Sequence, residues 1–296
     1  MYAALILLVG LLAPGVARAE DPEVPRHRLF LENSTAVRIN PLGLMEVANL
    51  SYRLKLMESD SILFEDTYLM VGPGLFLSPA FVKPGVRVEV MPIALLQLSA
   101  TYRYQYFLGT FDQIQSWPDP SADWSDTAIE ETGDEAYSTG GHQVVLQARL
   151  QAKVGPIAVR ETTRWEYNDL DITDGTVAYY DQTPDMLVPD KGWLMVSDLD
   201  VLYVHPDNTL KAGVRWTYTA HYYGNGLKSE GNDSQRLGPL VAYTFFDKPG
   251  AAFNQPTALV LAQWHLQHRF RTGEDVSQAL PYLAVAFQFV GDLLPW

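Results

Sequence analysis

Residues 96–106 read Leu-Gln-Leu-Ser-Ala-Thr-Tyr-Arg-Tyr-Gln-Tyr. Apolar or aromatic side chains occupy every even position, and polar side chains occupy every odd position. Successive side chains of a β-strand point to opposite faces, so this alternation predicts a strand with one apolar face and one polar face.

The same alternation recurs in several other stretches, each about 9–13 residues long. Four of them lie at residues 48–56, 143–154, 210–222 and 260–269. A strand that crosses a bilayer at a tilt needs about 9–11 residues. The pattern therefore favours an all-β transmembrane antiparallel up-and-down β-barrel, with hydrocarbon outside and water inside.

A soluble β-sandwich would also show alternation, but it fits this chain less well. Soluble strands usually have about five or six residues. Aromatic side chains gather near the ends of the runs, as at Trp165, Tyr167, Tyr222 and Tyr223. Aromatic girdles of membrane barrels produce this placement.

From residue 92 onward, short and long connections alternate. The short ones are 92–93, 155–156 and 205–208, and the long ones are 108–141, 169–192 and 224–236. Outer-membrane barrels have short periplasmic turns and longer external loops. We expect about twelve strands, with ten or fourteen as alternatives, near residues 28–39, 44–57, 62–77, 83–91, 94–107, 142–154, 157–168, 193–205, 209–223, 236–246, 257–270 and 281–290.

The first residues have the features of a secretory signal peptide. An apolar run at residues 3–12 is followed by Pro14 and Gly15, and then by small residues at Ala17 and Ala19. Such a segment is cleaved after the small residue. We therefore expect a signal peptide at residues 1–19 and a single barrel domain at residues 20–296.

At this point the sequence resembles bacterial outer-membrane β-barrel proteins as a class. The features that carry the resemblance are the signal peptide, the alternating strands, a last strand with one apolar face, and the terminal aromatic Trp296. The apolar face of that strand contains Leu283, Val285, Phe287 and Phe289, while Gly291 and Pro295 interrupt the pattern after it. The resemblance implies the outer membrane of a Gram-negative bacterium, contact with its lipids, and insertion by the barrel-assembly machinery. It implies no functional residues.

The polar face of the predicted strands is rich in charge, with more bases than acids. A lumen lined with Arg and Lys favours anions, whereas a narrow barrel could instead fill its interior with paired charges. The side chains predicted to face the lumen are Arg87, Arg103, Arg149, Lys153, Arg160, Arg164, Lys211, Arg215 and Arg269, with Glu89, Glu166, Asp198 and Asp200.

Negative charge is concentrated in the long connections, and the whole chain has a formal net charge of −14. Residues 108–141 contain eight Asp and Glu and no Lys or Arg. Charge runs of this kind usually mean solvated loops, although acidic oxygens could bind divalent cations. We also expect Trp117 and Trp124 to fold the first long loop over the barrel mouth. The net charge disfavours nucleic-acid binding.

No enzyme motif stands out. A barrel lipase would need a His–Ser pair near the outer leaflet, and His268 is the one histidine expected to face outward there. His265 and His268 are three residues apart, which would place them on opposite faces of a strand. His221 and Asp233 could imitate a protease cluster. We expect no catalytic, cofactor or metal residues.

The sequence therefore predicts a pore or transport-type channel for small hydrophilic solutes. A structural or surface-interaction barrel with a packed interior is the first alternative, and a membrane-embedded hydrolase is the second.

Overall fold

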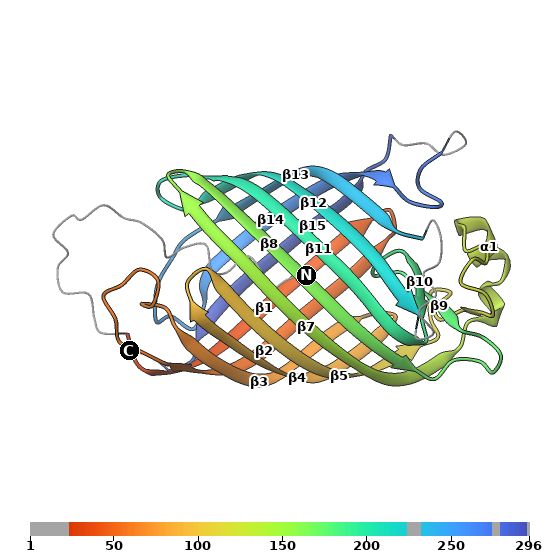
Figure 1. Ribbon diagram of the computed structural model, residues 1–296, viewed down its shortest axis with the longest axis horizontal. Helices are drawn as coiled ribbons and strands as arrows, with labels where there is room; N and C mark the ends of the chain where they lie inside the picture. Colours follow the sequence, from red (N-terminus) through yellow and green to blue (C-terminus); the bar gives the residue numbers. More distant parts are fainter. Residues whose placement is uncertain (1–23, 224–231, 274–278, 295–296) are drawn as a thin grey trace.

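The structure, a computed structural model, describes residues 24–223, 232–273 and 279–294. Within them, twelve strands close into an antiparallel barrel in which β1 pairs with β15 (Figure 1). The predicted fold class is confirmed. The barrel strands are β1 (His27–Ile39), β2 (Gly43–Lys55), β3 (Tyr68–Ser78), β4 (Phe81–Ile93), β5 (Leu96–Leu108), β7 (Ser138–Val154), β8 (Ile157–Leu170), β11 (Lys191–Val204), β12 (Leu210–Tyr223), β13 (Ser234–Thr244), β14 (Asn254–Gln267) and β15 (Tyr282–Asp292).

The strand expectations hold for all twelve barrel strands, with shifts at their ends. The largest shift is in the third strand, which was expected from residue 62 and begins at Tyr68. Residues before it form a turn, in which the Phe64 amide donates to the Ser61 carbonyl at 2.8 Å. Pro79 lies in the tight connection between β3 and β4. The predicted signal peptide lies outside the described residues.

Alternation places apolar side chains on the outside of the barrel. Leu98 and Tyr102 are 40% and 51% exposed, whereas Gln97 and Gln105 on the same strand are 3% and 0% exposed. Free monomers rarely expose this much apolar surface to water, so the outer wall fits hydrocarbon. Among the described residues, no helix is both long enough and apolar enough to cross a bilayer.

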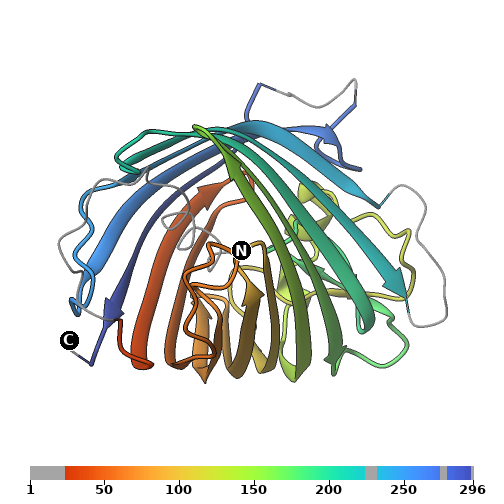
Figure 2. The ribbon, with the colours of Figure 1, turned by 60° about the vertical axis from the view of Figure 1, so that its left-hand side comes forward.

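The strands tilt and curl strongly around the barrel axis (Figure 2). Gly72, on the inner face of β3, is one place where the backbone itself needs this curvature. A Cβ atom at this position would lie 1.9 Å from the Leu50 carbonyl oxygen of β2. Glycine at inward positions lets neighbouring strands bend closely together, which closing a barrel requires.

The two ends of the barrel differ. The turn end holds the start of β1, the end of β15 and short connections such as residues 155–156. The loop end holds the connections after β5 and β8, which carry elements of their own. These elements are β6 (Ser116–Trp117), α1 (Asp126–Glu131), the 3-10 helix η1 (Gly133–Glu135), β9 (Ala178–Asp181) and β10 (Met186–Pro189).

Candidate functional site: a basic chamber beneath a loop plug

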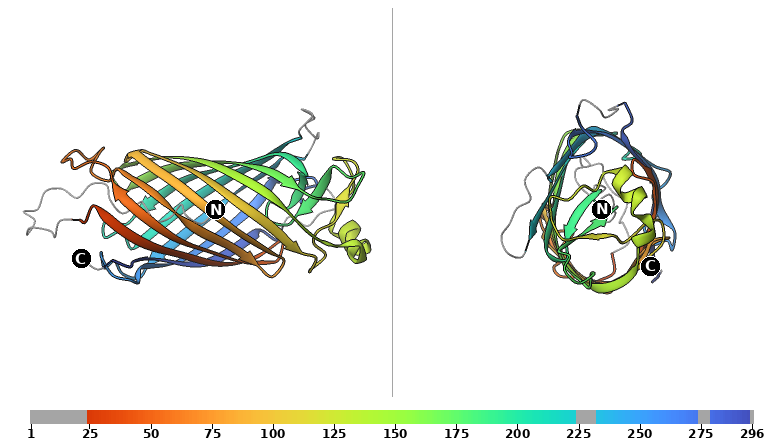
Figure 3. Two further views of the ribbon diagram at one scale, coloured as in Figure 1. Left: turned by 90° about the horizontal axis from the view of Figure 1, so that it is seen from below. Right: turned by 90° about the vertical axis from the view of Figure 1, so that its right-hand side faces the viewer.

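The two long loops at the loop end fold together into one body, here called the plug (residues 109–137 and 171–190). Its core is a three-stranded sheet in the order β10-β9-β6. Seen along the axis from the loop end, α1 and this sheet lie across the barrel opening (Figure 3, right). The expectation that the first long loop covers the mouth is confirmed.

Apolar contacts hold the plug against the inner wall. Trp124, expected in this role, is 1% exposed and packs with Tyr180 and with Leu194 of β11. Three strands further around the wall, Tyr179 and Val188 pack with Phe107 of β5. Burial of a large apolar side chain stabilises a structure by about 1.5–3 kcal/mol, so several such residues make the closed arrangement a stable one.

Polar contacts fix the tip of the β9–β10 hairpin. Arg38 of β1 donates to the carbonyl oxygens of Gln182 and Thr183 at 2.6 and 2.8 Å. Lys83 of β4 lies 3.9 Å from the Asp181 carboxylate. Two distant strands of the wall therefore hold one turn of the plug.

A second set of contacts centres on Asp185, at the same tip. Its carboxylate accepts hydrogen bonds from the Tyr180 hydroxyl at 2.7 Å and from Arg271 Nε at 3.0 Å. Arg271 lies in the connection after β14 and also pairs with Asp126 of α1, with Nη2 at 2.7 Å from Oδ1. Burial alone would raise the pKa of the Asp185 carboxyl, but His268 and Arg271 outweigh that effect and keep the pKa below its ordinary value.

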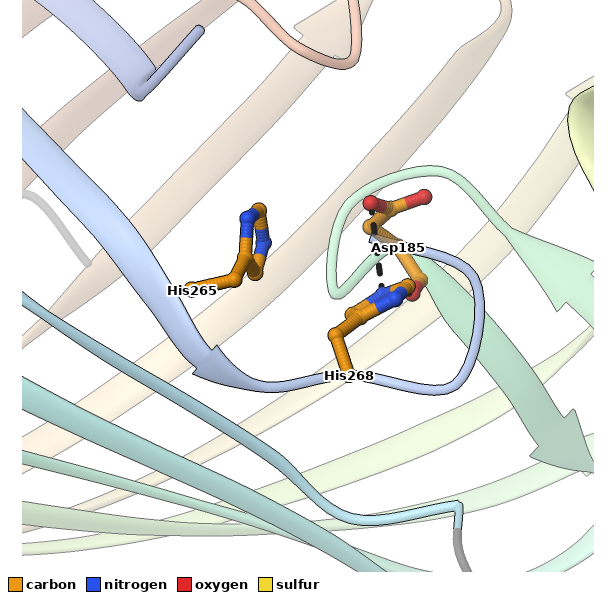
Figure 4. A group of neighbouring side chains, drawn as sticks. All are labelled: Asp185, His265 and His268. Atoms are coloured by element: carbon orange, nitrogen blue, oxygen red, sulfur yellow. Dashed lines mark hydrogen bonds and ion pairs between the residues drawn. The ribbon is translucent and has the colours of Figure 1, made fainter. Parts of the chain in front are cut away.

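Asp185, His265 and His268 form a compact group in which one potential ligand atom from each residue lies within 4.8 Å of the others (Figure 4). The hydrogen bonds of His268 argue against a metal there. Its Nε2 donates to the Asp185 backbone carbonyl at 2.9 Å, and its Nδ1 accepts from the Phe270 amide at 3.2 Å. A metal ligand needs a free lone pair on one nitrogen. Both ring nitrogens of His268 already have a backbone hydrogen-bond partner. The group acts as a hydrogen-bonded anchor for the plug.

These contacts correct three expectations about this segment. β14 ends at Gln267, and the His268 carbonyl then accepts from Thr272 Oγ1 at 2.6 Å in a turn. His268 is consequently buried beneath the plug instead of facing outward. The rings of His265 and His268 lie 5.0 Å apart instead of on opposite faces. Arg269 does not line the lumen, because it bonds to the Ser121 carbonyl of the plug at 2.6 Å.

Near the turn end, the lumen is narrowed by buried charged side chains. Asp200 of β11 accepts from Arg160 Nε at 2.9 Å and from Arg215 Nε at 2.6 Å. Asp198 accepts from Thr217 at 2.6 Å. On the facing wall, Glu89 accepts from Tyr68 at 2.6 Å and from Gln97. This part of the interior matches the packed, charge-paired alternative.

Between the plug and this narrowing lies the chamber, which consists of two adjoining cavities that both touch Phe76 and Arg164. Each encloses about 700 Å³ of empty space, counting its openings. Six basic side chains line the chamber against two acidic ones. They are Arg38, Lys83, Arg87, Arg103, Arg164 and Arg236, with Glu166 and Asp181.

Several guanidinium groups of the interior have no carboxylate oxygen within 4.0 Å among the described residues. Arg53 is one, with its Cζ 3.9 Å from the centroid of the Tyr68 ring, and three others lie deeper in the barrel. Arg103 contacts the Gln143 side-chain oxygen at 3.5 Å. Arg236 stacks on Tyr282, with 4.2 Å from its Cζ to the ring centroid. Arg149 is 0% exposed, and its three guanidinium nitrogens have no hydrogen-bond partner in the described segments. An unpaired buried charge is costly, so this interior needs water or anions to be stable.

The other predicted lumen residues also have defined places. Arg87 pairs with Glu32 at 3.2 Å and with Glu89, and Arg164 pairs with Glu166 at 2.5 Å. Lys153 and Lys211 lie on inward positions near the turn end, and Lys153 Nζ contacts Asn208 at 3.4 Å.

The sequence-based prediction did not identify several other side chains that face the lumen. Arg38, Lys83 and Arg236 occupy inward positions on β1, β4 and β13, where strand parity alone would have found them. His221 also faces inward. Asp233 accepts from the Tyr218 hydroxyl at 3.0 Å.

No family model matches the chain, and no curated protein matches its sequence. Similar solved structures include CdiB from Acinetobacter baumannii, at 10% identity over 91% of this chain and 60% of that chain, with a TM-score of 0.34. Another is the translocator domain of autotransporter NalP from Neisseria meningitidis, at 9% identity over 92% and 90% of the two chains, with a TM-score of 0.38. A third is the outer membrane protein OprD from Pseudomonas aeruginosa, at 9% identity over 90% and 93%, with a TM-score of 0.27.

The chain resembles bacterial outer-membrane β-barrels as a class. It spans 60% of the length of CdiB. These likenesses concern the barrel architecture alone.

Proposed function

We propose that this protein is an outer-membrane channel that passes small hydrophilic solutes, prefers anions, and is closed at rest by its plug. The observation that carries the proposal is the chamber lining, with six basic and two acidic side chains. Basic pore linings concentrate anions and exclude cations.

The size of the barrel is compatible with this role. Barrels of about 8 strands are filled by side chains, and those of 16–18 strands leave an open channel. Twelve strands give a lumen that loops and side chains can close and that small movements can open.

The plug is the part expected to move. It belongs to connecting loops, and elements that gate passage are usually drawn from such segments. Its tip is held by a small number of polar contacts from Arg38, Lys83 and Arg271. Loss of one of these contacts should shift the population toward an open state.

Single-channel recording in planar bilayers tests the proposal. The purified wild-type protein should give rare or small current steps, and the Arg271→Gln variant should give frequent ones. In a KCl gradient, the reversal potential of either protein should have the sign of chloride preference. Absence of current from both proteins, or a cation preference, would contradict a channel for anions.

A closed structural barrel is the second candidate, and the packed charges around Asp200 favour it. If Arg271→Gln releases the plug, as judged by faster proteolysis of residues 171–190, and still carries no current, the interior is closed at the turn end as well. That result would favour a structural role for the barrel.

The proposal includes export by a cleaved signal peptide and no enzymatic activity. Amino-terminal sequencing of the protein from outer-membrane fractions should begin at Glu20. Lipase and protease assays on pure protein should be negative, and activity lost in His268→Ala would revive the hydrolase alternative. We also propose three kinds of partner: outer-membrane lipids, the barrel-assembly machinery during insertion, and divalent cations at the acidic loops.

A further inference from the structure

We propose that the chamber cavity bounded by β2–β5, β7 and β8 is a binding site for a hydroxylated monocarboxylic acid, of the chemical class of the sugar acids. This inference rests on the proposed channel function and names the class of solute that the chamber recognises.

One basic side chain of the cavity is placed to pair with a negative group on the ligand. Three basic side chains line it: Arg87, Arg103 and Arg164. Arg87 is neutralised by Glu32 and Glu89, and Arg164 pairs with Glu166. Arg103 has no carboxylate oxygen within 4.0 Å among the described residues, so it is the guanidinium group of this cavity that a carboxylate on the ligand can pair with.

The geometry of Arg103 suits a carboxylate. Its guanidinium lies over the face of Phe76, with 5.6 Å between Cζ and the ring centroid. Within the part of the chain that the structure describes, its one side-chain acceptor is Gln143 Oε1, at 3.5 Å, the outer limit for a hydrogen bond. A guanidinium with available donors and a packed face binds a carboxylate through two parallel hydrogen bonds.

The rest of the lining suits hydroxyl groups and a carbon ring. Neutral polar side chains that donate and accept hydrogen bonds come from Asn49, Ser99, Thr101 and Gln147. An apolar surface comes from Phe76, Val47 and Val145. A simple inorganic anion would leave these groups unused, whereas a hydroxylated ring can contact both kinds of surface.

Binding by calorimetry in detergent tests this inference with D-glucuronate, D-glucose and acetate as probes. Wild-type protein should bind D-glucuronate at least about tenfold more tightly than either D-glucose, which lacks the carboxylate, or acetate, which lacks the hydroxyls. If the closed plug keeps the probes out of the chamber, the same titrations are made with Arg271→Gln, in which the plug should be released.

Two variants inside the cavity and one control outside it locate the site. Arg103→Gln should weaken D-glucuronate binding about tenfold or more, to the level of D-glucose. Lys153→Gln removes one lumen charge near the turn end, outside the cavity, and should leave binding unchanged. Thr101→Val should weaken D-glucuronate and leave acetate unaffected. Heat-modifiable migration on gels confirms that each variant is folded.

Equal affinity for D-glucuronate and acetate would overturn the inference, as would an Arg103→Gln variant with normal binding, or no binding to wild type and Arg271→Gln alike. Conduction is a separate measurement. Chloride-selective current without D-glucuronate binding would refute this binding site and would still support the proposed channel function. D-glucuronate binding without current would refute the channel function.

Discussion

The Arg271 guanidinium donates from Nε to the Asp185 carboxylate at 3.0 Å and joins the connection after β14 to the tip of the plug, 86 residues away in the sequence. Asp185 is 1% exposed, so its charge depends on this partner. This ion pair is therefore one of the contacts that hold the closed state of the barrel.

Replacing Arg271 by Gln should release the plug. Loss of one partner of a buried ion pair costs about 3–5 kcal/mol, because the other charge stays buried without compensation. Channel recordings should show a large increase in open time. Lys191→Gln is the matched control, because its exposed pair with Asp169 is worth about 0–1 kcal/mol. Equal open times in both variants would contradict the role of Arg271.

Acidification should also open the channel. Burial lowers the pKa of His268 below its ordinary value of 6.5, and the pKa of Asp185 is lowered as well. As the pH falls below about 6.5, a released plug takes up a proton on His268 and the closed one does not, so the closed state loses stability. Below about pH 4 the released state gains a second proton at Asp185, and the effect has the same sign.

The pH effect is measured as open time between pH 7.5 and 5. His268→Gln keeps a side-chain donor toward the Asp185 carbonyl and removes the titrating imidazole, so the dependence between these values should flatten. His205→Gln, in an exposed turn, should behave as wild type. A His268→Gln variant with the wild-type pH curve would show that another group is responsible.

Reversing the charge of Arg103 should reverse or abolish the ion preference of the pore. Arg103→Glu places a carboxylate beside Glu166 in the chamber, and a negative lining favours cations. The reversal potential in a KCl gradient should move toward potassium preference. Lys248→Glu makes the same change of charge outside the lumen, in the exposed connection between β13 and β14, and should leave the potential nearly unchanged.

Asp200→Asn should destabilise the barrel. The substitution leaves Arg160 and Arg215, which are 1% and 4% exposed, without their shared carboxylate, at a cost of about 3–5 kcal/mol. Urea unfolding of the refolded protein in lipid should show a lower midpoint. Asp207→Asn, in an exposed turn, is the control. A midpoint equal to that of wild type would mean that water reaches these arginines.

Gly72→Val should prevent folding, because its Cβ would overlap the Leu50 carbonyl oxygen of the neighbouring strand. The yield of heat-modifiable barrel after refolding measures this. Ala100→Val adds the same kind of bulk at an exposed, outward position of β5 and should fold normally. Normal folding of Gly72→Val would show that the wall can straighten at this point.

The strands and the faces of their residues could be predicted because the signal is local. In residues 96–106 the side-chain period is two, and each residue's face follows from its neighbour. The same rule identified Arg103, Arg160 and Asp200 as inward. It failed at His268 and Arg269, because a turn after Gln267 ends the strand and the parity with it.

The amino-acid sequence by itself determined that this chain has alternating strands with an apolar outer face and a basic inner one. Only the tertiary structure decided that the two acidic loops fold into a plug and that Asp185 meets His268 and Arg271. It also decided that no carboxylate oxygen of the described residues lies within 4.0 Å of the Arg103 guanidinium. The reason is physical: strand periodicity repeats every two residues, whereas these contacts join groups more than 80 residues apart, and no local pattern encodes such a distance.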